Sequence, residues 1–376
     1  MKRRNLLLAA SASAGVSLWP LATSRAAGAR VVSFGQSASL SGGQASYGRD
    51  VQNGIAAAFA AANANEAGTG LHFDLQTLDD GGVRSRCMKN VMQLVESGSA
   101  ALIGLTSGAG AEACMPVIED AQIAMLGTAS GNMGIRSGNL GGAFHVRAGY
   151  DAEYKRMVGY VKDFGMQRVG VVYLGDTSKA NLEAMNAALA AMSIQPKVAI
   201  AIDRNATSFD GVANELLAAR LDCVLFTANA GPVGKIIDHL VRGKYAGLFY
   251  ASSFAGQDLI DTLTARKQSC VMSMVVPRPS QMGVNVVAQC QRDLALLNNG
   301  ARLGITTLEG YISGRIAVEA THAAAKTGTP NRTRMRESLA GLRSDLGGYK
   351  VDFAGTTHGS RYVDLIAIDR YGRLVG

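Results

Sequence analysis

The sequence predicts an α/β fold in which two similar Rossmann-like lobes each contain a central, mainly parallel sheet. Short apolar runs alternate with amphipathic stretches along the chain, and this alternation favours parallel strands joined by crossover helices. The alternation restarts in the middle of the chain, which indicates two sheets rather than one. The length of 376 residues is enough for two domains of ordinary size, each with its own core.

The first half of the chain supplies the elements of one sheet. A helix over 48–65 is predicted because the spacing of Val51, Ile55 and Phe59 places them on one face. A helix over 110–121 is predicted although Pro116 lies within it. Strands are expected at 30–36, 72–80, 100–105 and 123–127, with a further helix at 83–97.

The second half repeats this rhythm and then becomes mainly helical. Strands are expected at 168–175, 221–228, 247–253 and 270–277, and helices at 181–192, 209–220 and 231–243. Three more helical stretches follow at 283–298, 308–328 and 332–342. Residues 347–353 and 361–375 are expected to end the chain as a hairpin-like pair.

Residues 1–29 have the pattern of a secretory signal peptide, with a basic start, a short apolar middle and a small-residue end. Arg3 and Arg4 resemble a twin-arginine export signal, although the general secretion route also fits. Residues 27–29 offer an A-x-A cleavage site, so the mature chain is expected to begin at Arg30 and to work in the periplasm.

The mature chain is expected to be mildly basic. Its formal net charge falls from +8 to about +4 when the signal is removed with its Lys and Arg residues. No run of basic residues alternates with aromatic residues, so nucleic-acid binding is not expected. No later segment has the length and apolarity of a membrane helix, so insertion of the mature chain into a membrane is not expected either.

Five cysteines remain after export, and cysteines can pair in an oxidising compartment. Cys87 and Cys114 lie near the starts of neighbouring helical segments, and we expect them to form a disulfide. Cys270 and Cys290 flank one strand-to-helix unit and are the second expected pair. Cys223 lies in a predicted buried strand and is expected to be an inert thiol. No C-x-x-C motif occurs, so the sequence offers no support for a metal site.

Two polar loops follow neighbouring predicted strands. Residues 106–110 follow the strand 100–105, and residues 128–131 follow the strand 123–127. The carboxyl ends of parallel strands meet at the edge where open α/β sheets bind ligands. Each loop alone also fits a plain turn or helix cap. Because two such loops are adjacent, we favour a binding site for a carboxylate or carbonyl oxygen at a helix N-terminus.

Motifs for nucleotide binding and catalysis are missing from these loops. A P-loop requires a Lys after its last Gly, whereas Ala111 and Glu112 follow Gly110. The segment "LTSGAG" also lacks the G-x-S-x-G pattern of a nucleophile elbow. A hydrolase or reductase would need a His or cofactor motif, and none of the five His residues lies in one. We therefore expect a binding protein that is not an enzyme and needs no cofactor or metal.

The order of these segments resembles the type I periplasmic solute-binding proteins of ABC importers, specifically the leucine/isoleucine/valine-binding class. The resemblance covers essentially the whole chain. Residues 100–131 resemble the paired ligand loops, and residues 144–154 and 275–279 resemble the first two interlobe crossings. The resemblance implies two lobes, joined by three crossings, that close on a ligand without catalysis. It assigns 30–147 and 279–350 to lobe 1 and 148–278 and 351–376 to lobe 2.

The resemblance also implies a set of ligand-binding residues. In the second lobe, Ser253 and Phe254 stand where amino-acid binders place a carboxylate for the ligand ammonium. Ser178 lies near a position that is usually aromatic, and Tyr150 and Phe254 are candidates to pack on an apolar or aromatic ligand. The first-lobe positions that match the family's site are Tyr47, Thr106, Ser107, Gly108, Ala129, Ser130 and Gly131.

A buried ammonium without a carboxylate partner is costly. We therefore expect a small organic carboxylate, delivered to an inner-membrane ABC permease by a monomeric protein. Asp176 could replace the missing carboxylate only if its loop turns inward. A branched-chain amino acid or amide is the alternative ligand, and a periplasmic sensor or a carrier of lipid-like molecules is the alternative role on the same fold.

Overall fold

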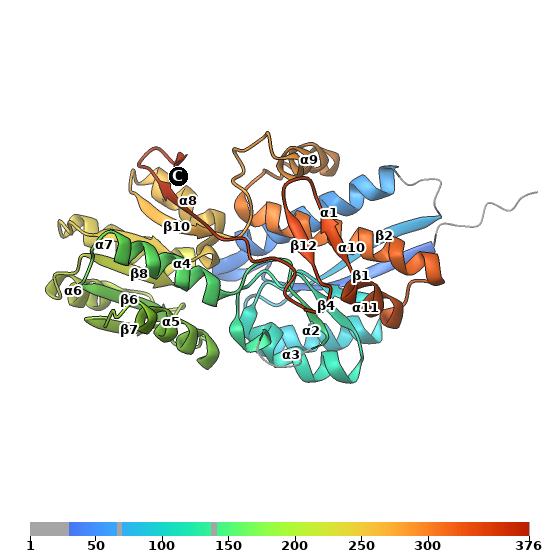
Figure 1. Ribbon diagram of the computed structural model, residues 1–376, viewed down its shortest axis with the longest axis horizontal. Coiled ribbons are helices and arrows are strands. Elements are labelled where there is room, and N and C mark those ends of the chain that lie inside the picture. The colour runs from blue at the N-terminus through green and yellow to red at the C-terminus, as the bar shows by residue number, and fades with distance from the viewer. Residues whose placement is uncertain (1–29, 66–69, 137–140, 376) are drawn as a thin grey trace, which may run out of the picture.

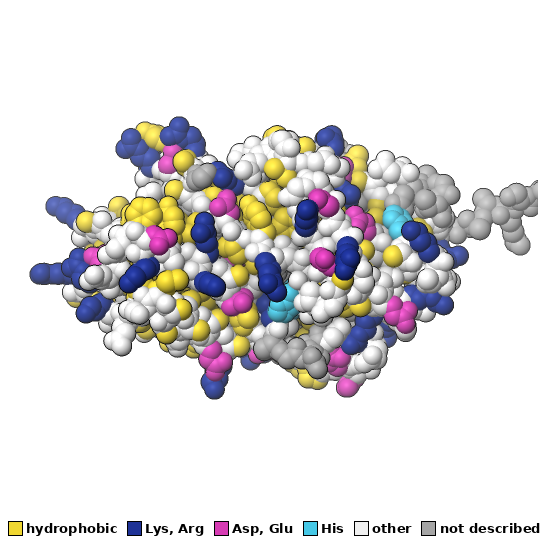
Figure 2. All heavy atoms as spheres, viewed as in Figure 1, with side chains coloured by type: hydrophobic (Ala, Val, Ile, Leu, Met, Phe, Trp, Pro, Cys, Tyr) yellow, Lys and Arg dark blue, Asp and Glu magenta, His cyan; other side chains and the backbone are white. Residues whose placement is uncertain are grey.

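The structure is a computed structural model that describes residues 30–65, 70–136 and 141–375. The predicted signal peptide lies outside these residues. Two sheets flanked by helices occupy the two ends of an elongated molecule (Figure 1). Basic and acidic side chains are interspersed over the face shown in Figure 2. No helix in the described part of the chain is long and apolar enough to cross a membrane.

The first sheet contains five strands in the order β2-β1-β3-β4-β5, and all of its strand pairs are parallel. Strands β1 and β2 pair along their whole length, from Arg30 opposite Leu71 to Ala38 opposite Asp79. The strands are β1 Arg30–Ala38, β2 Leu71–Asp79, β3 Ala101–Ile103, β4 Ala124–Leu126 and β5 Ala143–Phe144. The short β3 and β4 are completely buried, which explains why they form continuous apolar runs in the sequence.

Helices from both ends of the chain cover the first sheet. Helix α1 packs along α10, so residues far apart in the sequence lie side by side (Figure 1). Glycine allows this close approach, because a Cβ at Gly54 would lie 2.1 Å from the carbonyl oxygen of Thr307. These helices are α1 Ala45–Asn65, α2 Arg84–Glu96, α3 Gly108–Asp120, α9 Asn285–Leu294, α10 Ile305–Thr327 and α11 Arg332–Ala340.

The second sheet contains seven strands in the order β14-β13-β10-β9-β8-β6-β7. Strands β6 to β10 pair in parallel, whereas β13 and β14 join the edge as antiparallel strands. The strands are β6 Val169–Leu174, β7 Val198–Ile202, β8 Cys223–Thr227, β9 Leu248–Ala251, β10 Cys270–Met274, β13 Asp364–Ile368 and β14 Leu374–Val375. The helices are α4 Tyr150–Asp163, α5 Lys179–Ala191, α6 Asp210–Ala218, α7 Ala230–Arg242 and α8 Gly256–Ala265.

The predicted α/β fold with two mainly parallel sheets is confirmed, and Pro116 does lie inside α3. The predicted pairing of 347–353 with 361–375 is wrong. Residues Lys350–Asp352 form β12, which pairs with β11 at Arg343–Asp345, whereas β13 pairs with β10 and β14. Strand β13 carries a nearly continuous apolar run, and burial beside β10 removes it from water. The sequence analysis also missed the edge strand β7.

Three chain segments pass between the sheets, after β5, after β10 and before β13. The Tyr349 hydroxyl donates to the carbonyl oxygens of Val146 and Val275, at 2.8 and 3.0 Å, and so joins the first two crossings. A β-bridge between His145 and His358 joins the first crossing to the third. The crossings therefore form one hydrogen-bonded waist between the two sheets.

Candidate ligand site

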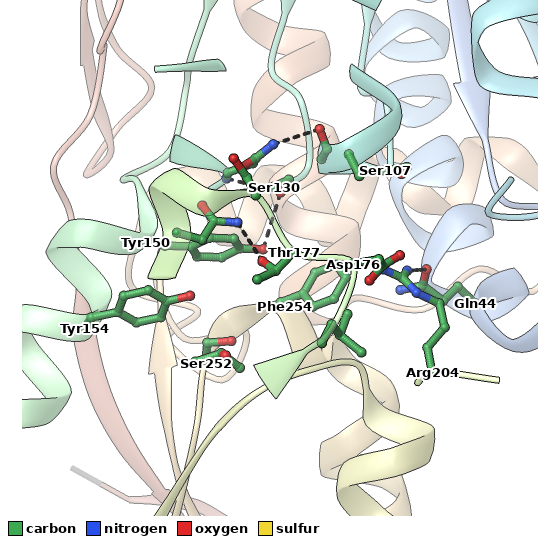
Figure 3. A pocket seen from close by; sticks show the side chains of 17 residues that line it. Gln44, Ser107, Ser130, Tyr150, Tyr154, Asp176, Thr177, Arg204, Ser252 and Phe254 are labelled. Carbon is green, nitrogen blue, oxygen red and sulfur yellow. Dashed lines mark hydrogen bonds and ion pairs between the residues drawn. The ribbon is translucent and has the colours of Figure 1, made fainter. Parts of the chain in front are cut away.

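A cavity lies between the carboxyl ends of the strands of the two sheets (Figure 3). The first sheet contributes Ser107 at the start of α3 and Ser130 after β4. The second sheet contributes Thr227 at the end of β8 and Ser252 after β9. Both open sheets thus present the edge at which such folds bind ligands.

The cavity is small because its two sides touch. Ser178 donates to the Glu112 carboxylate at 3.2 Å, and the backbone N–H of Met133 donates to Asn181 Oδ1 at 2.7 Å. The cavity volume is about 40 Å³, enough for a few water molecules. The lobes are therefore closed on each other, and an organic ligand requires them to separate.

Hydroxyl groups from the first sheet line one wall. Ser107 Oγ accepts the backbone N–H of Gly110 at 3.0 Å and so caps α3. Ser130 Oγ accepts the backbone N–H of Asn132 at 3.2 Å and lies 3.3 Å from the Tyr150 hydroxyl. Both serines hold their loops in place while presenting a hydroxyl to the cavity.

Ser252 lines the opposite wall and has no hydrogen-bond partner for its side chain within the described part of the chain. The residue is only 1% exposed. A buried hydroxyl without a partner costs free energy, so this group can gain a hydrogen bond from a ligand at little further desolvation cost.

Aromatic rings form the apolar wall of the cavity. Tyr150 and Tyr154 are stacked, with ring centroids 5.6 Å apart and planes inclined by 16°. Phe254 lies edge-on to Tyr150 at 6.4 Å, and its ring faces the cavity between the serines and Asp176 (Figure 3). Burial raises the pKa of Tyr150 to about 12. The phenol is therefore a neutral hydrogen-bond donor at neutral pH.

The charged residues lining the cavity, among those described, are Asp176 and Arg204. Arg204 Nη2 lies 2.7 and 2.8 Å from the two carboxylate oxygens of Asp176. Its Nη1 also donates to Gln44 Oε1 at 3.5 Å. The loop carrying Asp176 does turn inward, but its carboxylate is already neutralised by a guanidinium.

The structure brings together only part of the predicted ligand set. Ser107, Gly108, Ser130, Tyr150, Ser178 and Phe254 line the cavity. Tyr47, Thr106, Ala129, Gly131 and Ser253 do not. Tyr47 donates to the Ala129 carbonyl at 2.7 Å, Thr106 Oγ1 accepts the N–H of Ser39 at 3.0 Å, and the Gly131 carbonyl accepts the N–H of Tyr150 at 2.8 Å. These groups hold the cavity loops in place through hydrogen bonds with backbone groups.

Ser253 belongs to a buried ionic cluster beside the cavity. Arg147 Nη2 donates to Ser253 Oγ at 2.6 Å, and Ser253 Oγ donates to Glu153 at 3.0 Å. Arg147 also contacts Glu309 on α10 at 3.2 Å and Glu153 on α4 at 2.5 Å. Burial would lower the pKa of Arg147, but the carboxylates of Glu309 and Glu153 raise it above its ordinary value. The cluster thus ties both lobes to the first crossing.

The sequence analysis missed several lining residues. Thr227 ends β8 and Ser252 follows β9, so the strand-end argument used for the first sheet would have found them. Arg204 lies in a turn and Gln44 ends a short 3-10 helix, and neither carries such a signal. The other missed lining residues are Ala109, Asn132, Tyr154, Leu174, Thr177 and Asn181.

All five cysteines are free thiols in the structure, so neither predicted disulfide is formed. Cys270 lies in β10 and its thiol donates to the Phe249 carbonyl, whereas Cys290 lies on α9, which packs against α1 in the other lobe. Cys87 and Cys114 do lie in contact, with their Sγ atoms 3.9 Å apart. Their disulfide stays a prediction. The described residues contain no cluster of three or more metal-ligating side chains.

The two-lobed fold and the cavity between strand ends define a ligand-binding protein, and comparison with known proteins gives its family. A model of the periplasmic binding protein family matches residues 31–366, so the chain belongs to that family. The comparison with curated proteins gave no match.

Solved structures of similar proteins share the fold. A substrate-binding periplasmic protein from Ralstonia solanacearum is 23% identical, with a TM-score of 0.84 over 92% of this chain and 99% of that one. A possible leucine/isoleucine/valine-binding protein from Rhodopirellula baltica is also 23% identical, with a TM-score of 0.85 over 93% and 97%. A solute-binding protein of an ABC transporter from R. palustris, in complex with benzoate, is 13% identical, with a TM-score of 0.77 over 92% and 95%.

Proposed function

We propose that this chain is the substrate-binding component of an ABC importer, which closes two lobes on a small organic carboxylate with an apolar or aromatic body. In this proposal the signal peptide exports the chain to the periplasm, where it acts without catalysis as a monomer and delivers its ligand to an inner-membrane permease. The lobes are 30–147 with 279–350, and 148–278 with 351–376.

The pairing of Asp176 with Arg204 is the observation that carries the choice of ligand. A ligand ammonium would need a carboxylate partner, and the one carboxylate among the described lining residues is held by two contacts of 2.7 and 2.8 Å. A carboxylate ligand needs donors instead, and the hydroxyls of Ser107, Ser130 and Ser252 face the same space.

The aromatic wall favours a flat or apolar ligand body. The stacked rings of Tyr150 and Tyr154 and the edge-on ring of Phe254 offer apolar contact area beside the donors. The benzoate complex of the similar R. palustris protein shows that this fold can hold an aromatic carboxylate. The lobes separate to admit the ligand. Contacts from both lobes to the bound ligand then stabilise the closed state.

Calorimetric titration of the exported chain with benzoate and with leucine tests this proposal. Benzoate is expected to bind and to raise the melting temperature, since a ligand of the native state stabilises it. Ser107→Ala and Ser130→Ala should each weaken binding by about 1–3 kcal/mol. The control Ser280→Ala removes an exposed hydroxyl that does not line the cavity. Unchanged affinity in both cavity variants would refute the site.

An ammonium-bearing ligand is the second candidate, because the Asp176 side chain lines the cavity and is 53% exposed. Such a ligand would have to displace Arg204 from Asp176. Arg204→Gln should then improve leucine binding and leave benzoate binding no stronger. If leucine binds the unmodified chain more tightly than benzoate, the second candidate replaces the first. The absence of permease and ATPase genes near this gene would favour a sensor or lipid-carrier role.

A further inference from the structure

A second groove lies at the waist of the molecule, lined by residues of α4, α5 and the third crossing. We call it the hinge groove and define it by Arg136, Ala152, Lys155, Ala188, His358 and Arg361. Its volume is about 520 Å³, within the range of small-molecule sites.

The hinge groove carries a net positive charge. Lys155 and Arg361 are exposed at its rim, and Arg136 lies deeper. Burial and the neighbouring Arg136 lower the pKa of His358, which is therefore neutral at neutral pH. The acidic lining residue among those described is Asp151, in the first turn of α4, where the helix N-terminus already favours a carboxylate. Positive groups therefore outnumber negative ones around an open space.

Arg136 is the second observation that points to an anion. The residue is 6% exposed, and within the described chain it forms no ion pair. Its Nη1 and Nη2 donate to the carbonyls of Arg147 and Ser130, both at 3.1 Å, and its Nε has no hydrogen-bond partner among the described residues. Burial lowers the pKa of Arg136 to about 9. The direct hydrogen-bond partners of this buried cation are carbonyl oxygens, and the carboxylates of Asp151 and Glu153 act on it only through space. It therefore gains free energy from an anion in direct contact.

The rest of the groove wall is apolar. Alanines of α4 and α5 line it, including Ala152, Ala184 and Ala188. Small methyl side chains leave room against the helices and contribute apolar surface that a purely inorganic ion would not cover. The lining thus combines a cationic rim and floor with an apolar wall.

We propose that the hinge groove is a second binding site, which takes a small amphiphilic carboxylate with its charged end towards Arg136, Lys155 and Arg361. Its apolar body lies on the alanines of α4 and α5. The site is separate from the ligand cavity, and Arg136 connects them: it lines the groove and donates to the backbone carbonyl of Ser130, which lines the cavity. The site goes beyond the proposed function and does not depend on it.

Calorimetric titration of the exported chain with sodium hexanoate tests the proposal. The double variant Lys155→Gln/Arg361→Gln removes the rim charges and should weaken hexanoate binding about fivefold or more. The control Arg156→Gln/Lys162→Gln removes two exposed charges of the same helix outside the groove and should leave hexanoate binding unchanged. Equal affinities for the two double variants would overturn the site.

Two further measurements distinguish hexanoate binding in the hinge groove from hexanoate binding in the ligand cavity. Phe254→Ala disables the ligand cavity, and hexanoate should still bind this variant in a manner that depends on Lys155 and Arg361. If Phe254→Ala abolishes all hexanoate binding, the groove is not a site and only the cavity binds carboxylates. If inorganic phosphate displaces hexanoate as effectively as benzoate displaces it, the alanine wall contributes nothing to binding. The proposed class of ligand, an amphiphilic carboxylate, is then wrong.

Discussion

Arg147 donates to the Ser253 hydroxyl across 2.6 Å, although the two residues are 106 positions apart in the sequence. This contact turns Ser253 away from the ligand cavity and into a cluster with Glu153 and Glu309. The position at which related amino-acid binders are expected to hold an ammonium thus serves here to join the lobes at the first crossing. Its neighbours Ser252 and Phe254 line the cavity instead.

The first prediction concerns the buried charge of Arg147. Arg147→Met should lower the free energy of unfolding by about 3–5 kcal/mol, because it leaves the buried carboxylates of Glu153 and Glu309 without their partner. Urea denaturation measures the change. Arg156→Met, which replaces an exposed arginine on the neighbouring helix α4, is the control. If the two variants unfold at the same urea concentration, the cluster does not stabilise the closed structure.

The second prediction uses the unpartnered hydroxyl of Ser252. Ser252→Ala should leave the melting temperature of the ligand-free chain unchanged or slightly raised, because no hydrogen bond is lost. Benzoate affinity should fall by about 1 kcal/mol if the ligand satisfies this hydroxyl. Ser273→Ala is the matched control, since its buried Oγ donates to Glu153 at 2.5 Å and its loss should destabilise the chain. A comparable loss of stability in both variants would contradict the assignment.

The third prediction is a pH dependence of lobe closure. Burial, reinforced by Asp258 and Asp261 on α8, raises the pKa of Asp50 on α1 to about 7, with Arg49 opposing the shift. When the lobes separate, Asp50 is better solvated and its pKa falls towards 3.8. A raised carboxyl pKa means that the closed state binds the proton more tightly. Closure is therefore favoured at low pH, and this contribution is lost as pH rises from about 4 through about 7.

Asp50→Asn removes this titration, so ligand affinity should change less between pH 5 and 8 in the variant than in the unmodified chain. Calorimetric titration across this range measures the difference. Asp74→Asn, another half-buried carboxylate but on β2 away from α8, is the control and should keep the pH dependence. Identical pH profiles for the unmodified chain and Asp50→Asn would show that protonation of Asp50 is not coupled to lobe closure.

The fourth prediction concerns Cys87 and Cys114, whose sulfur atoms are 3.9 Å apart. The hydrogen bond from Cys114 lowers the pKa of Cys87 and so favours its reactive thiolate. After export, intact-mass measurement should show a chain lighter by two hydrogens. Reduction should then lower the free energy of unfolding by about 2–4 kcal/mol. Cys87→Ser/Cys114→Ser should be insensitive to reductant; if the unmodified chain is equally insensitive, the pair stays reduced.

The sequence predicted the fold well because its apolar patterns are local. The buried runs of β3, β4, β6 and β8 are continuous, and the helices between them show one apolar face. Edge elements were harder. Strand β7 alternates between half-buried and exposed residues. Strand β12 pairs with β11 in a separate hairpin, whereas β13 lies between β10 and β14, and these partners are distant in the sequence.

The first-lobe half of the site was also accessible from the sequence. Ser107 and Ser130 follow two adjacent parallel strands, and the geometry of parallel sheets brings such positions together. The second-lobe half was accessible only in part: Thr227 and Ser252 lie at strand ends, whereas Arg204 reaches Asp176 and Gln44 from a turn that no sequence pattern marks. No periodicity in the sequence records a contact between residues that far apart.

By itself, the sequence determined the two-sheet architecture, the paired polar loops and the lack of a free carboxylate at Ser253 and Phe254. These follow from local hydrophobic spacing and residue type. Only the tertiary structure decided which side chains line the cavity and which hold the lobes together. The reason is that Arg147, buried at the first crossing, needs compensating groups from both lobes. Ser253 is one of these groups, so its hydroxyl binds Arg147 and does not face the cavity, where the family resemblance had placed it.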